Sequence, residues 1–296
     1  MSMPVRAQPV PALGATSRGD RIVGRLFLAF LVLSLAVGFV TLGALLVDVL
    51  RDGVPNLSWR LLSHPPSVDP AKAGARPAIL ASFYIGLLLI AFTVPLGVGT
   101  AVYLEEYANK SRWYNRVLEV NIQNLAGVPS IVYGILGLAF LVRGLGLGRV
   151  LLAGALILTL LVLPTVIVAS REAIRAVPDS IRQGAFALGA TKWQVVWRQV
   201  LPAAIPGIAT GSILSVSRGI GETAPLLLVG AVTYVAFNPT LLGAFTALPI
   251  QIFQWVGRPQ AEFKELAAAA IIVLLVMLLG LNAIAIWLRN RYQRKW

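Results

Sequence analysis

The stretch PDSIRQGAFALGATKWQVVWRQVLP, residues Pro178 to Pro202, interrupts a chain that is otherwise mostly apolar. Its pattern predicts two short amphipathic helices. The first would take Asp179 or Ser180 as a side-chain N-cap and would stop at Gly189, where a left-handed backbone costs least. The second would start after Thr191. Its apolar side chains recur at i, i+3, i+4 and i+7, namely Trp193, Val196, Trp197 and Val200.

Three interpretations are open for this helix-glycine-helix unit. It could lie as a basic amphipathic helix on the inner face of a membrane. A DNA-binding helix-turn-helix has a similar outline, but here it would sit in a membrane protein beside two tryptophans. The third interpretation is a docking element that inserts into a partner protein on the cytoplasmic side. In each case Pro202 lacks the N–H needed to continue a helix, and we expect the chain to bend there.

The composition is that of a polytopic membrane protein. Of the 296 residues 57% are hydrophobic and only 12% are charged, and the mean hydropathy is +0.80. No cysteine is present, which excludes disulfides and thiolate metal sites, and the single histidine, His64, lies beside two prolines in an expected loop. We therefore predict neither a metal site nor a catalytic site, and no cofactor bound by this chain.

Six apolar segments are expected to cross the bilayer, which takes about 20 residues each. They cover residues 26–47, 79–104, 117–140, 150–169, 203–218 and 266–287. The third contains Gly127-Val128-Pro129-Ser130, which predicts a helix break shielded from lipid. The apolar run 226–235 is too short to cross and is expected to extend the fifth span or to re-enter the membrane. The sequence thus predicts an all-α membrane domain over residues 26–288, between tails at 1–25 and 289–296.

The basic residues set the expected orientation. Six spans place both termini on one side, and most of the 25 lysines and arginines fall on that side or in the segment from Arg171 to Arg198. By the positive-inside rule, both termini and residues 178–202 are cytoplasmic, in a plasma (inner) membrane. The same rule explains the formal net charge of +13 without nucleic acid.

Two carboxylates, Glu105 and Glu106, end the second span. Paired carboxylates can perform general acid-base catalysis, but no other catalytic group is nearby. The basic residues Lys110, Arg112 and Arg116 follow closely in the sequence. We therefore predict a solvated, salt-bridged collar at the membrane boundary.

The run SRGIGETAP, residues 217–225, places charge inside the membrane. An arginine in a transmembrane helix costs roughly 2.5–3.5 kcal/mol on insertion scales. Arg218 and Glu222 would share a helix face and could form an ion pair that holds two helices together. Alternatively, Arg218 lies in the pathway of an anion, because its planar fork matches an oxyanion, and Glu222 is the built-in counter-ion that lets the anion leave. Ser217 and Thr223 flank the pair in the same candidate pathway.

The stretch from Pro178 to Pro202 resembles a known sequence signature. Gln183-Gly184-Ala185, then Gly189, then Leu201-Pro202, have the spacing of the EAA loop of ABC importer membrane subunits. Gln183 and Gly184 stand where that family has Glu and Ala, so no salt bridge from Gln183 is assumed. In the family this loop forms a coupling helix in a groove of a separate ATPase subunit, which implies the docking interpretation.

Four further motifs resemble the PstA-type permeases of the phosphate-specific ABC importer over residues 74–288. They are YLEEYA, GVPSIVYGILGL, SRGIGETAPLLLVG, and FTALPIQIFQW followed by RPQAEF. The resemblance implies the type I importer permease fold and the passage of inorganic phosphate past Arg218 and Glu222. It also implies a heterodimer with a PstC-type permease, a PstB-type ATPase dimer that binds ATP and Mg, and a PstS-type phosphate-binding protein.

The motifs that the sequence lacks argue against other functions. It has no GxxxxGK[ST], no HExxH and no nucleophile-base pair, so it is predicted to be neither an ATPase nor another enzyme. Another oxyanion, such as sulfate or molybdate, would suit Arg218 equally. An ion-coupled secondary transporter could use Glu222 to carry a proton, but no inverted repeat is evident and the coupling segment would then have no role.

Overall fold

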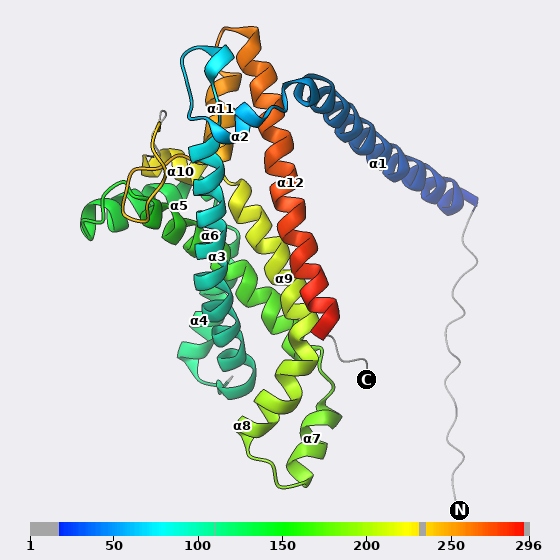
Figure 1. Ribbon diagram of the computed structural model, residues 1–296. Helices are drawn as coiled ribbons and strands as arrows, with labels where there is room; N and C mark the ends of the chain where they lie inside the picture. The colour runs from blue at the N-terminus through cyan, green and yellow to red at the C-terminus, as the bar shows by residue number, and fades with distance from the viewer. Residues whose placement is uncertain (1–17, 110, 231–234, 293–296) are drawn as a thin grey trace, which may run out of the picture. The chain divides into compact units, whose positions relative to one another are not determined.

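Every regular element in the part of the chain that the computed structural model describes, residues 18–109, 111–230 and 235–292, is helical (Figure 1). The chain divides into two units, Met1–Asp48 and Val49–Trp296. Most of the first unit is α1, Arg18–Gly53, a 36-residue helix that is long enough to cross a bilayer. The predicted tail over residues 1–25 is therefore helical from Arg18 onward, and residues 1–17 lie outside the described residues.

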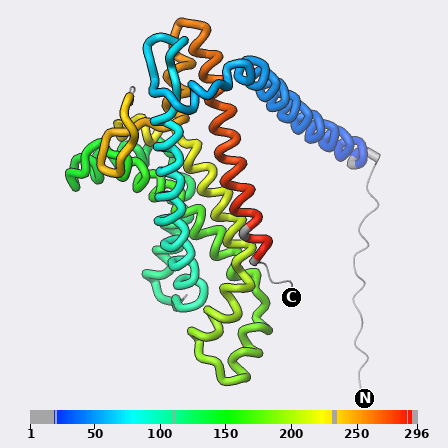
Figure 2. Tube along the Cα trace, viewed as in Figure 1, coloured from blue at the N-terminus to red at the C-terminus, as the bar shows by residue number. Residues whose placement is uncertain are grey.

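Four long helices run side by side in the second unit (Figures 1 and 2). They are α3 (Arg76–Val102), α6 (Leu151–Arg175), α9 (Leu201–Gly221) and α12 (Ala261–Tyr292). Helix α6 packs against both α3 and α9 and supplies much of the central apolar cluster. With α1, these helices account for the five that are long and apolar enough to span a membrane.

Small residues let α6 and α9 approach closely. A Cβ added to Gly207 would lie 2.7 Å from the Cβ of Ala173, and a Cβ on Gly211 would meet Ala169 one turn further along. The two glycines are four residues apart and so lie on one face of α9. This spacing is typical of close helix contacts in membranes.

The expected break in the third span is present. Helix α4 (Trp113–Ala126) and helix α5 (Ser130–Gly137) meet at an angle of 107°. The π-helical turn η4 (Leu138–Gly144) continues α5. The Tyr133 hydroxyl donates to the carbonyl of Leu125 at 2.9 Å, which also accepts from the Val128 amide at 3.1 Å, and so links α5 to the end of α4. Within the described residues, five helices are thus long and apolar enough to span a membrane, or six if this bent pair counts as one span.

The apolar run that begins at residue 226 does not extend the fifth span over the residues that the structure describes. Helix α9 ends at Gly221, the backbone of Glu222 is extended, and a separate helix, α10 (Ala224–Val229), packs against α5. Gly230 ends α10 in the left-handed conformation, and residues 231–234 lie outside the described part. Of the two alternatives for this run, extension of α9 is therefore wrong, because the Gly-rich end of that helix lets the chain turn; re-entry into the membrane stays a prediction.

Short helices close the two ends of the four-helix body (Figure 1). At one end lie η1 (Val54–Asn56), α2 (Trp59–Ser63), η2 (Pro70–Lys72) and α11 (Leu248–Val256). Of these, α2 and α11 contribute to the apolar cluster that contains the fully buried Trp255 and Phe263. At the other end lie η3 (Tyr103–Tyr107), α7 (Asp179–Ala187), α8 (Lys192–Val195) and η5 (Val196–Val200). Helix α12 runs toward this second end and continues to Tyr292, four residues into the tail predicted at 289–296.

Candidate functional site

Helix α7 ends as the sequence predicts. Gly189 has φ +79°, and the amides of Gly189 and Ala190 donate to the carbonyls of Phe186 and Ala185 at 2.9 and 3.1 Å. These two bonds form a Schellman motif, in which glycine is favoured because a Cβ would be strained. The predicted N-cap is wrong. Pro178 occupies that position, and Asp179 instead accepts a hydrogen bond from Arg182 at 3.0 Å within the first turn.

The second helix begins where expected but does not end at Pro202. The Thr191 hydroxyl accepts from the Gln194 amide while the Gln194 side chain accepts from the Thr191 amide, which is a capping box. From Lys192 the helix then runs without a break through η5 into α9. Within η5 the Leu201 amide donates to the carbonyl of Val196, five residues earlier. This wider turn lies directly before Pro202. Its hydrogen bonds do not need an N–H from Pro202, so the helix continues past the proline.

The buried face of this helix differs from the predicted stripe. Val195, Val196 and Val200 are fully buried, whereas Trp193 and Trp197 are exposed and pack on each other with ring centroids 5.0 Å apart. Val195 and Val200 belong to an apolar cluster at the end of α6, which leaves the wide indole rings at the edge. The exposed pair is therefore available to a partner surface.

The other residues predicted for coupling lie at the far end of the helical body. Gln183, Gly184 and Gly189 are exposed, whereas Ala185, Leu201 and Pro202 are half-buried. Leu188, which the motif did not single out, is 90% exposed. Helix α7 and the helix formed by α8 and η5 make a helical hairpin. A hollow of about 290 Å³ lies between its two helices, lined by residues that include Leu188, Gly189, Gln194 and Arg198. This end combines apolar side chains with a concave surface, as a docking site requires.

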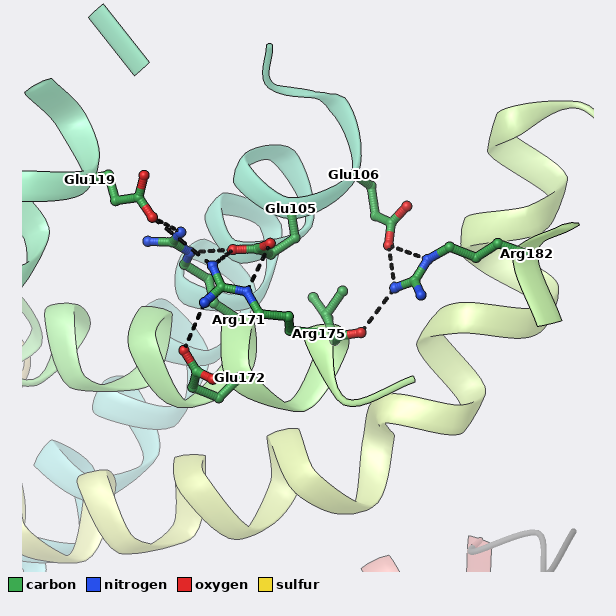
Figure 3. A network of polar contacts seen from close by, with 8 residues as sticks. Glu105, Glu106, Glu119, Arg171, Glu172, Arg175 and Arg182 are labelled. Atoms are coloured by element: carbon green, nitrogen blue, oxygen red, sulfur yellow. Dashed lines mark hydrogen bonds and ion pairs between the residues drawn. The ribbon is translucent and has the colours of Figure 1, made fainter. Parts of the chain in front are cut away.

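Glu105 and Glu106 form ion pairs, as predicted, but with other partners and away from solvent (Figure 3). Glu105 is 5% exposed and accepts from Arg171 at 2.8 Å and from Arg175 at 2.6 Å, both on α6. Arg171 also binds Glu119 of α4. The predicted collar is therefore salt-bridged but not solvated at these two carboxylates, and α6 and α7 supply cations that the sequence did not single out; Lys110 lies outside the described residues.

Arg182 joins α7 to the same end of α3 (Figure 3). Its guanidinium donates to Glu106 from Nε at 3.1 Å and from Nη2 at 2.9 Å. The remaining donors reach the carbonyls of Val177 at 2.6 Å and Ile174 at 3.0 Å, besides the Asp179 carboxylate. No motif predicted this residue, and its signal in the sequence is a cation three residues after Asp179.

In the candidate substrate pathway, Arg218 and Glu222 lie together as predicted. Arg218 Nε is 3.5 Å from Glu222 Oε1, and the exposed fractions of the two side chains are 63% and 19%. Both residues belong to α9 and its C-cap. The pair therefore does not hold two helices together, which contradicts that interpretation and leaves most of the guanidinium open to a ligand or partner.

The two other predicted pathway residues point elsewhere. Ser217 donates to Asn282 of α12, and Thr223 precedes α10 in the break after α9. Ser217 and Asn282 line an apolar groove of about 390 Å³ among α3, α9 and α12, which also includes Arg289. Arg289 donates to Thr210 at 2.7 Å, one heptad away from the Ser217–Asn282 contact on both helices. In the described part of the chain, no group of three or more His, Asp or Glu side chains could hold a metal ion.

Comparison with known proteins places this architecture. Residues 93–296 match the family model described as binding-protein-dependent transport system inner membrane component. The probable ABC transporter permease protein YqgI of Bacillus subtilis is 33% identical over 83% of this chain and 88% of its own length. The phosphate transport system permease protein PstA of Yersinia pestis is 34% identical over 86% of this chain and 87% of its own length.

A solved structure shares the fold. The crystal structure of a bacterial ABC transporter involved in the import of the acidic polysaccharide alginate contains a chain that aligns with a TM-score of 0.65. The alignment covers 94% of this chain and 100% of that one at 16% identity, a likeness that concerns the fold alone. From the family match and the two relatives it follows that the chain belongs to the binding-protein-dependent transport system inner membrane components, the multi-pass permease subunits of ABC transporters, which are transport components and not enzymes.

Proposed function

We propose that this chain is the permease subunit that passes inorganic phosphate inward in an ATP-driven, binding-protein-dependent importer. The observation that carries the proposal is Arg218, which is 63% exposed at the end of a membrane-spanning helix and has Glu222 as its ion-pair partner. Several relatives at 31–38% identity are named phosphate transport system permease proteins, which supports phosphate as the anion.

The chemistry of the pair suits a transported anion. A guanidinium stays charged at any relevant pH and offers parallel donors to two oxygens of phosphate. Glu222 competes for those donors, so phosphate binds without being trapped. Ser217 and Thr223 are the neighbouring hydroxyl groups of the same proposed pathway. Catalysis and a resident metal are not part of this function.

Energy is proposed to come from a separate ATPase dimer of the PstB type, which binds ATP and Mg itself. Its docking site on this chain is the segment from Pro178 to Pro202, with Gln183, Gly184, Ala185, Gly189, Leu201 and Pro202 as the motif positions. A PstC-type permease would complete the membrane domain, and a PstS-type protein would deliver phosphate from outside. Both termini of this chain, with α7 and α8, then lie on the cytoplasmic side. ATP-driven closure would expose Arg218 to one side at a time.

The deciding experiment is uptake of radiolabelled phosphate into vesicles that hold this chain with those partners, with and without ATP and with sulfate as a competitor. We expect ATP-dependent uptake that excess sulfate does not reduce. Competition by sulfate would assign the permease to another oxyanion. Uptake driven by a proton gradient without the ATPase would overturn the proposal in favour of a secondary transporter.

A further inference from the structure

All five N–H donors of the Arg182 guanidinium make hydrogen bonds within the protein. A guanidinium has five N–H groups, and Arg182 makes two hydrogen bonds to Glu106, one each to the carbonyls of Ile174 and Val177, and one to Asp179. The exposed fractions of the Arg182 and Glu106 side chains are 17% and 10%. Hydrogen bonds from a charged, planar guanidinium are strong and directional where little water is present. Arg182 therefore holds its partners in fixed directions.

The segment that carries Arg182 has non-helical backbone at both ends. Pro178, just before α7, has ψ 138°, and Gly189, just after it, is left-handed. Helix α7 packs mainly on the rest of its own hairpin, α8 and η5. The ion pair to Glu106 therefore ties α7 to a part of the chain 76 residues away, the π-helical end of α3.

Beyond Glu106, neighbouring charges join three helices into one block. Glu105, the adjacent residue on η3, binds Arg171 and Arg175 of α6, and Arg171 also binds Glu119 of α4. A displacement of η3 would therefore be shared by α3, α4 and α6. Buried ion pairs are weak evidence for stability, because apolar replacements often serve as well. Their directional bonds are better suited to fixing the relative positions of helices.

We propose that the Arg182–Glu106 ion pair transmits the movement of α7 to the ends of α3 and α4, so that the ATPase acts on these helices as well as on α9. Arg182 and Glu106 are positioning residues, since neither touches phosphate or ATP. This inference rests on the proposed function, in which α7 docks on the ATPase. Loss of the pair lets α7 follow the ATPase without moving η3, and ATP is then hydrolysed without transport.

The test measures phosphate uptake and ATP hydrolysis on the same vesicles of the complete transporter. Arg182→Lys keeps the charge but loses the fork, and Glu106→Gln keeps the shape but loses the charge. We expect both variants to assemble and hydrolyse ATP while phosphate carried per ATP falls roughly five-fold or more, the lower end of typical coupling between sites. Asp69→Asn is the matched control, because it makes the same chemical change in an exposed pair with Lys72.

A rescue experiment separates transmission from simple stabilisation. The chain has no cysteine, so Glu106→Cys combined with Arg182→Cys creates two unique thiols that a bifunctional maleimide can join. We expect the double variant to be uncoupled and the cross-link to restore phosphate carried per ATP. Wild-type ratios in all variants, or complexes that no longer assemble, would overturn the inference. A wild-type complex without ATP-driven phosphate uptake would instead overturn the proposed function.

Discussion

Gly207 of α9 packs directly against Ala173 of α6, so closely that a Cβ on Gly207 would lie 2.7 Å from the Cβ of Ala173. We expect Gly207→Val to destabilise the protein by about 1–3 kcal/mol, the usual cost of overpacking. The midpoint of thermal unfolding of the purified protein in detergent reports this cost. Gly280→Val is the control, since nothing lies within 4 Å of a Cβ at that position of α12. Equal midpoints for the two variants would show that the α6–α9 contact can relax.

Replacing the pathway arginine should strongly reduce transport without affecting assembly. In Arg218→Gln the charge and the fork are lost, and we expect phosphate uptake to fall by a factor on the order of ten or more, since a hydrogen bond to a charged group contributes about 1.5–3 kcal/mol. Arg218→Lys should retain part of the activity. Arg143→Gln, at an exposed arginine of η4, serves as the control. Loss of the purified complex instead of its uptake would indicate a structural role for Arg218.

Removing the counter-ion should have the opposite effect on binding. In the wild-type chain the guanidinium of Arg218 lies 3.5 Å from a carboxylate oxygen of Glu222. In Glu222→Gln this carboxylate is absent, and the guanidinium would be free to hold phosphate more tightly. We expect a lower half-saturating phosphate concentration together with a lower maximal rate, because release becomes slower. Initial rates of uptake over a range of phosphate concentrations separate the two parameters. A raised half-saturating concentration would contradict the proposed competition.

The two glycines of the coupling motif should respond differently to alanine. Gly189 has φ +79°, where a side chain costs about 1–2 kcal/mol, so Gly189→Ala should weaken ATPase binding roughly 5- to 30-fold, the equivalent of that energy. Gly184 is helical and a Cβ there meets nothing within 4 Å, so Gly184→Ala should bind as the wild type does. Titration of the ATPase onto immobilised permease measures both. Equal affinity for Gly189→Ala would remove this turn from the docking surface.

Features encoded by neighbouring residues could be predicted from the sequence. The left-handed turn at Gly189, the break at residues 127–130 and the contact between Arg218 and Glu222 each depend on side chains within a few positions of one another. Local rules of backbone geometry suffice for such features. The direction in which Arg218 faces depends on how α9 packs, which those rules do not determine.

The partners of the paired carboxylates could not be predicted. Glu105 binds Arg171, which lies 66 residues away in the sequence, although three cations follow Glu106 within ten residues. Which cation lies near depends on the packing of α3 against α6, and one sequence does not specify that distance. The continuation of the helix past Pro202 was missed for a related reason, since a π-helical turn leaves no composition signal of its own.

The π-helical turn Val196–Val200 changes the direction in which the residues after it face relative to the residues before it. One residue advances a helix by about 100°, so an extra residue accommodated in Val196–Val200 rotates everything beyond it by that angle relative to what precedes it. The exposed edge at Trp193 and the face of α9 that carries Arg218 thus belong to one continuous helix, Lys192–Gly221, with a fixed angular offset between them. Deleting one residue from this turn would leave both surfaces intact and aim them in mismatched directions.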